Sequence, residues 1–200
     1  MENFLKPLVA YFVMMDPVGT ALIFNALTEG QERRYYHTMA VRSVILSAIL
    51  VLFFGFWGVP LLTLLGIQMD SFRIAGGFLI FYAAFGMITR PDTGQSPPPA
   101  DYFKDISVYP LTIPLIAGPG CLTLTVLLFS KARDEGTGIL PLVLAILAIL
   151  LLTYVSFLFS KSFARMLGQT AGGIFNRLLG VLLASLAIQF IADGIRGLWG

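Results

Sequence analysis

The residues best suited to chemistry lie at two interruptions of apolar sequence. Residues 15–20 read MDPVGT and interrupt a run about long enough to cross a membrane, and residues 116–122 read IAGPGCL and interrupt another. Proline and glycine break helices, and the first stretch also holds a carboxylate. Because a bilayer makes both a broken backbone and a buried charge costly, we expect each interruption to line a cavity.

The first interruption is predicted to begin a second half-helix. Aspartate favours the N-cap of a helix, where its oxygen accepts backbone N–H groups, and proline favours the first helical position. We therefore expect Asp16 to cap a half-helix running from Pro17 to about Leu27. Asp16 also has two candidate functional roles, facing a ligand ammonium or carrying a coupling proton, and the alternative is a purely structural cap.

The second interruption is predicted to leave its half-helix uncapped. Gly118 would be the cap and Pro119 the first helical residue, and glycine supplies no capping oxygen. We expect the N–H groups near Cys121 and Leu122 to stay available to a ligand. The positive end of a half-helix suits an anion such as a carboxylate.

These two stretches supply the predicted binding residues. The substrate-binding set is Asp16, Pro17, Gly19, Thr20, Asn25, Gly118, Pro119, Gly120, Cys121 and Thr123. The Asp16 carboxylate and the unwound carbonyls of Met15 and Ala117 are the candidates for a coupling proton or sodium ion. The alternative for the threonine hydroxyls is a bond to a carbonyl of their own helix, which is common in membrane spans.

The composition identifies the class of protein that must position these residues. Of 200 residues, 57% are hydrophobic and 12% are charged, about half the charged fraction of a soluble domain. This composition predicts an integral membrane protein whose partner is the lipid bilayer. A net charge of +2 gives no reason to expect nucleic acid, and the single cysteine allows no internal disulfide. The sequence has no ATPase or hydrolase motif and no Cys/His cluster, so we expect no enzyme, no cofactor and no bound metal.

Stretches poor in charge predict six spans. They are approximately 4–27, 43–69, 74–89, 106–130, 136–160 and 178–192. The first, third and fifth connecting loops hold eight lysine and arginine residues, namely Arg33, Arg34, Arg42, Arg90, Lys104, Lys161, Arg165 and Arg177. The other side holds five. The positive-inside rule then predicts that both termini lie outside.

An internal repeat is predicted around a Pro-rich polar linker, TGQSPPPAD. Arg73 begins RIAGGFLIFYAAFGMI, and Arg177, 104 residues later, begins RLLGVLLASLAIQFI. Pro17 and Pro119 are 102 residues apart. We therefore predict a three-span repeat at 1–90, a linker at 91–105 and a second three-span repeat at 106–200. Because each repeat has an odd number of spans, the two repeats would cross the membrane in opposite directions. Inverted repeats with paired broken helices are typical of transporters. The alternative to a repeat is that the apolar segments are similar by chance.

The chain also resembles a known family. MDPVGTALIF, RIAGGFLIFYAAFGMI, PLTIPLIAGPG and NRLLGVLLASLAIQFIADGI are similar, in this order, to stretches of the MarC family of prokaryotic inner-membrane proteins. The resemblance implies a six-span fold related to LysE-type exporters and, as described for some members, transport of small neutral amino acids such as glycine and alanine. Members often have Asn where this chain has Thr20 and Pro where it has Leu22.

Together these observations predict an all-α membrane protein with six transmembrane helices in two inverted three-helix repeats, the first and fourth helices being broken. The predicted function is secondary transport of small neutral amino acids across the inner membrane by alternating access, coupled to a proton or sodium gradient. The alternatives are an exporter of other small amphiphiles or drugs, an ion channel and a non-transporting scaffold. A homo-oligomer is compatible with each.

Overall fold

The computed structural model describes residues 2–89 and 105–199, and this part of the chain is helical with no strand. The elements, in chain order, are α1 (Glu2–Met15), α2 (Pro17–Leu27), α3 (Arg33–Leu64), α4 (Met69–Thr89), η2 (Ser107–Ile116), α5 (Pro119–Asp134), α6 (Leu140–Leu158) and α7 (Ser160–Trp199). The predicted all-helical class is thereby confirmed. Of the predicted linker, only Asp105 lies within the described residues.

The helices provide five or six candidate membrane spans. Five stretches are long and apolar enough to cross a bilayer: Asn3–Leu27, Arg33–Leu64, Met69–Thr89, Leu140–Leu158 and Arg177–Trp199. The sixth arises when η2 and α5, which meet at a bend of 54°, are taken as one span. The predicted breaks in the first and fourth spans are present, at the junctions α1–α2 and η2–α5.

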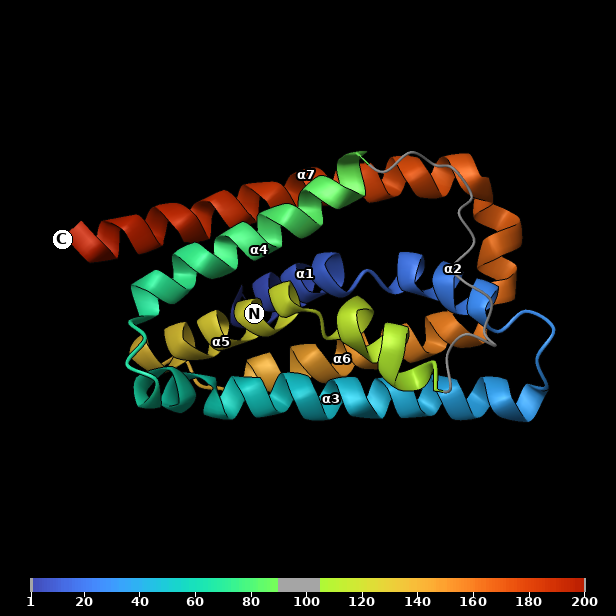
Figure 1. Ribbon diagram of the computed structural model, residues 1–200, viewed down its shortest axis with the longest axis horizontal. Helices are drawn as coiled ribbons and strands as arrows, with labels where there is room; N and C mark the ends of the chain where they lie inside the picture. The colour runs from blue at the N-terminus through green and yellow to red at the C-terminus, as the bar shows by residue number, and fades with distance from the viewer. Residues whose placement is uncertain (1, 90–104, 200) are drawn as a thin grey trace.

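The two broken spans lie between two pairs of other helices (Figure 1). On one side α4 packs against α7, and on the other side α3 packs against α6. Within this frame α1 and α2 contact α6 and α7, whereas α5 contacts α3 and α4. The interior is apolar, with Tyr11, Phe24, Phe129 and Phe157 among its largest fully buried side chains.

Glycines allow α4 and α7 to pack closely along their lengths. A Cβ atom added to Gly77 would lie 2.9 Å from the carbonyl oxygen of Ala187, and one added to Gly194 would lie 2.7 Å from the carbonyl oxygen of Asp70. Both distances are too short for a carbon and a main-chain oxygen, so only glycine fits. These contacts bring together α4 and α7, the helices that hold the two similar stretches beginning at Arg73 and Arg177. Close packing of these helices is not a symmetry between the two halves, so the inverted repeat stays a prediction.

The connection between the fifth and sixth spans differs from the prediction. Residues 161–177, which we treat as a loop from their charges, belong to the single long helix α7. The physical reason is that no proline follows Pro141 in the sequence, so nothing in this segment forces the helix to end.

The segment η2 is irregular because of its prolines. Tyr109 and Ile113 have extended backbone angles, and each immediately precedes a proline, a position at which the helical conformation is disfavoured. The peptide bonds Tyr109–Pro110 and Ile113–Pro114 are cis. This irregular segment is anchored to α3, since the Thr112 hydroxyl donates to the carbonyl of Ser43 at 3.2 Å.

An ion pair anchors the start of η2 to α3. The Asp105 carboxylate lies 2.9 Å from the guanidinium of Arg42, and it accepts hydrogen bonds from the hydroxyl and the backbone N–H of Ser107. The hydrogen bonds from Ser107, helped by the charge of Arg42, hold the pKa of Asp105 below its usual range. The charged form of Asp105 is therefore the form that the folded protein favours.

We expect Asp105→Asn to lower the melting temperature of the solubilised protein at pH 7 by up to about 4 °C, since a partly exposed ion pair contributes at most about 1 kcal/mol. The stabilisation by ionised Asp105 is complete above the ordinary aspartate pKa of about 3.9 and is lost as the pH falls through the lower pKa of the folded state. The difference between the melting temperatures of variant and wild type should therefore be larger at pH 7 than at pH 3. An equal difference at both pH values would contradict a role for the charge.

Candidate functional site

The first break is built by Asp16 and the residues that follow it. Asp16 has φ 41° and ψ 70°, the left-handed conformation that aspartate tolerates better than most residues. Its Oδ1 accepts the backbone N–H of Gly19 at 3.0 Å, and α2 begins at Pro17 as predicted. Across the break, the Thr20 hydroxyl donates to the carbonyl of Met15 at 2.9 Å. The freed backbone groups at this break thus find partners nearby.

Gly19 is required by the position of the Asp16 carboxylate. A Cβ atom on Gly19 would lie 2.8 Å from Cγ of Asp16 and closer still to Oδ2. Any side chain at position 19 would therefore displace the carboxylate. Oδ1 is the capping atom, and within residues 2–89 and 105–199 the structure describes no hydrogen bond to Oδ2.

The second break has no side-chain cap. α5 begins at Pro119, and its N-cap, Gly118, contributes no side-chain hydrogen bond, as predicted. The prediction that the N–H of Leu122 stays available is wrong, because it donates to the carbonyl of Gly118 at 3.0 Å in the first turn of the helix. The N–H groups of Gly120 and Cys121 remain as the uncapped donors at the positive end of α5.

The two breaks lie beside each other inside the bundle, where Met14 of α1 contacts Gly120 of α5. The terminal methyl of Met14, near the end of α1, occupies the place that a side chain on Gly120 would need. The same place is bounded by Cγ1 of Ile80 on α4, at 3.4 Å. A side chain larger than that of glycine at position 120 would force the flexible Met14 side chain to move.

A buried hydrogen-bond chain holds α1 against α5 beside the breaks. The Tyr11 hydroxyl donates to the Thr125 hydroxyl at 3.1 Å, and Thr125 donates to the carbonyl of Cys121 at 2.8 Å. Tyr11 and Thr125 are both fully buried. Sequence reasoning missed Tyr11, although a tyrosine in an apolar run five residues before an aspartate is a polar signal that could have been noticed.

The other predicted residues divide into those near the breaks and one farther away. The Thr123 hydroxyl bonds to the carbonyl of Pro119 in its own helix, which is the alternative stated for it. The Thr20 hydroxyl differs, because it bonds across the break to the carbonyl of Met15 in α1. Ala117 is buried, and its N–H donates to the carbonyl of Thr112. Asn25 lies two turns along α2, half-buried and away from the break.

Ser47 is a second residue that sequence reasoning missed. Its hydroxyl is fully buried and has no hydrogen-bond partner in the part of the chain that the structure describes. Ser47 lies one helical turn beyond Ser43, whose carbonyl binds Thr112, and on the same buried stripe of α3. The pair of serines four residues apart in an apolar span was the available signal.

Comparison with known proteins gives one family and no solved structure. The family model described as "MarC family integral membrane protein" matches residues 1–199. The chain is 30% identical to a UPF0056 membrane protein of Methanocaldococcus jannaschii, with 98% of each chain covered. It is 31% identical to the UPF0056 membrane protein YvbG of Bacillus subtilis, covering 96% of this chain and 93% of that one. It is 32% identical to the UPF0056 inner membrane protein YhgN of Escherichia coli, with 98% of each covered. No solved structure matches the chain.

The orphaned hydroxyl of Ser47 allows a test of whether the protein keeps an unpartnered polar atom inside the bundle at a cost in stability. We expect Ser47→Ala to raise the melting temperature by about 2–4 °C, since a buried unpartnered hydroxyl costs roughly 1 kcal/mol or more. Ser43→Ala is the matched control, because the Ser43 hydroxyl is equally buried but bonds to the carbonyl of Ala40 at 3.1 Å. A loss of stability as large for Ser47→Ala as for Ser43→Ala would mean that the hydroxyl has a partner after all.

Proposed function

The chain belongs to the MarC family of integral membrane proteins, and from this premise we propose that it is a secondary transporter of small zwitterions, with neutral amino acids of the glycine and alanine class as substrates. One observation carries the proposal: two broken spans touch inside the bundle where Met14 meets Gly120. Interrupted helices in a membrane are tolerated where the freed backbone lines a binding cavity.

The two breaks offer opposite charges to a ligand. At the first break the Asp16 carboxylate keeps Oδ2 available after capping α2 through Oδ1, and this oxygen receives the ammonium group of the substrate. At the second break the N–H groups of Gly120 and Cys121, at the positive end of an uncapped helix, receive its carboxylate. The apolar side chains around the contact, Met14 and Ile80, favour a small neutral substrate.

Transport proceeds by alternating access, with the two predicted three-span repeats rocking against each other around the breaks. Coupling follows from the same residues: Asp16 carries a proton, or the carbonyls of Met15 and Ala117 hold a sodium ion. The protein acts without catalysis, in the inner membrane, as the name of the Escherichia coli relative suggests. From the charges of the loops both termini lie outside.

Uptake into liposomes tests the proposal. Purified protein in liposomes should take up labelled alanine and glycine saturably, driven by a proton or sodium gradient, and Asp16→Asn should reduce this uptake at least about tenfold, because a buried charge partner of a ligand contributes about 2 kcal/mol or more. Asparagine is also a good N-cap, so the variant keeps the helix start. Glu29→Gln, an exposed charge change in the connection after α2, is the matched control and should transport like the wild type.

The alternatives give different results in the same assay. A channel conducts current that alanine does not compete for, and a scaffold shows no uptake in any gradient. A drug exporter moves larger amphiphiles and ignores alanine. Absence of saturable alanine or glycine uptake by folded, inserted protein would reject the amino-acid proposal.

The single cysteine reports on the breaks without any mutation. Cys121 is buried in the first turn of α5, with 1% of its surface exposed. If the breaks open alternately to each side, a membrane-permeant maleimide should label Cys121 slowly in reconstituted protein. Saturating alanine should change the labelling rate at least about threefold by shifting the population of open states. Labelling that alanine leaves unaltered would contradict binding of alanine at this position.

A further inference from the structure

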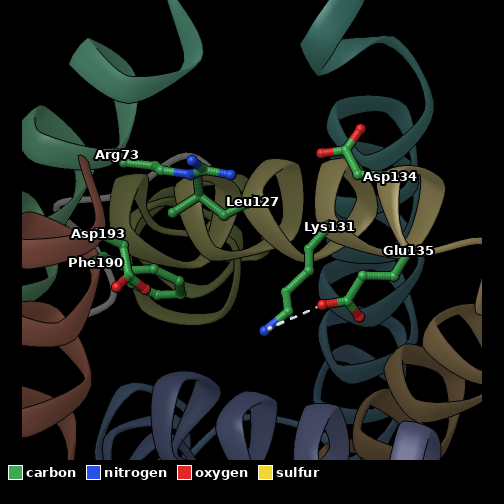
Figure 2. Close-up of a pocket in the computed structure, with 7 residues that line it drawn as sticks. All are labelled: Arg73, Leu127, Lys131, Asp134, Glu135, Phe190 and Asp193. Carbon is green, nitrogen blue, oxygen red and sulfur yellow. Dashed lines mark ion pairs between the residues drawn. The ribbon is translucent and has the colours of Figure 1, made fainter. Parts of the chain in front are cut away.

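A charged cleft of about 300 Å³ lies at the end of the bundle where α5 ends (Figure 2). α4 and α7 supply one wall, with Arg73, Phe190 and Asp193, and α5 supplies the other wall and the floor, with Lys131 and Leu127. None of the predicted substrate-binding residues lines this cleft. It is therefore a place separate from the breaks.

Each wall carries charges of both signs. On the first wall, Arg73 bonds to Asp70 of its own helix at 2.7 Å, and Asp193 lies 4.0 Å from Arg196 of its own helix. On the second wall, Lys131 pairs with Glu135 of the same stretch of chain at 3.7 Å, the dashed line of Figure 2.

Every ion pair described around the cleft thus joins groups of a single wall, and none of those described crosses it. Figure 2 shows Lys131 extending into the space between the walls, opposite Asp193. Lys131 and Asp193 remain partly exposed, with 65% and 44% of their side chains accessible. Because such exposed pairs within one helix are weak, a ligand carrying both charges can compete for these groups and bridge the walls.

The cleft is in line with the two breaks. Below its floor at Leu127, α4 meets α5 where the methyl of Thr123 fills the place of a side chain on Gly76. One turn further along, α4 and α5 meet again at Ile80 and Gly120, beside the breaks. Two layers of tight contact between the same two helices therefore separate the cleft from the proposed binding site.

We propose that this cleft is an access site, in which a small zwitterion binds at the membrane surface before or after it occupies the breaks, and that the contact of Gly76 with Thr123 is the barrier between the two sites. Lys131 binds the anionic group of the ligand and Asp193 binds its ammonium group. This inference rests on the proposed function. The same pair of charges would suit the head group of a zwitterionic phospholipid, and the experiment separates the two sources.

The test compares the KM and the maximal rate of alanine uptake into liposomes between the wild type and the Lys131→Gln variant. The Arg133→Gln variant is the matched control. Arg133 is a cation on the same helix that does not line the cleft, and it donates to the carbonyl of Phe56 at 3.0 Å. We expect Lys131→Gln to raise KM about two- to fivefold with the maximal rate nearly unchanged, since an exposed charge contributes about 0.5–1 kcal/mol. Arg133→Gln should leave KM unchanged. Asp193→Asn should raise KM as Lys131→Gln does.

The outcomes separate this inference from the proposed function. A wild type without alanine uptake would reject both. A wild type that transports, with equal KM values for Lys131→Gln and Arg133→Gln, would reject the access site alone. Vesicles of phosphatidylcholine and phosphatidylethanolamine are compared in parallel. If Lys131→Gln changed only the maximal rate, and only in one of these lipids, the cleft would belong to the lipid head group and the access site would again be rejected.

Discussion

The constraint on which this structure depends is that a polar backbone group inside a membrane needs a partner. The two breaks meet it differently. At Asp16 the chain supplies its own partners, a carboxylate for the N–H of Gly19 and a threonine hydroxyl for the carbonyl of Met15. At Gly118 it supplies no side-chain cap. At the first break side chains of the protein thus satisfy these backbone groups, whereas at the second the first turn of α5 has no side-chain cap. In the proposed function the substrate carboxylate is the partner of these donors.

The remaining helices keep this incomplete arrangement in place. Glycines bring α4 close to α7 and to α5, and the buried contact between Tyr11 and Thr125 ties α1 to α5. At the other end, Asp105 and Thr112 fasten the irregular η2 to α3. The broken spans therefore lie inside a frame of longer helices (Figure 1).

Local chemistry made the half-helices predictable, because aspartate, proline and glycine determine a helix start within a few residues. The starts at Pro17 and Pro119 follow from it directly. What the sequence did not reveal depends on contacts between distant segments: Met14 against Gly120, the orphaned Ser47 hydroxyl, and a cleft assembled from three helices. The continuous α7 was missed because its charges resembled those of a loop, although no proline interrupts it.

The geometry of α5 has a mechanical consequence. This helix starts at the bend beside Gly118 and continues without a proline after its first residue to Asp134. A movement at the bend would therefore tilt the helix as one straight arm. Lys131 lies twelve residues from Pro119, roughly 18 Å along the axis. A tilt of about 10° at the pivot would sweep the Lys131 end through about 3 Å while hardly displacing Cys121. A rotation too small to disturb the buried break would thus be amplified into a visible change of width at the membrane surface.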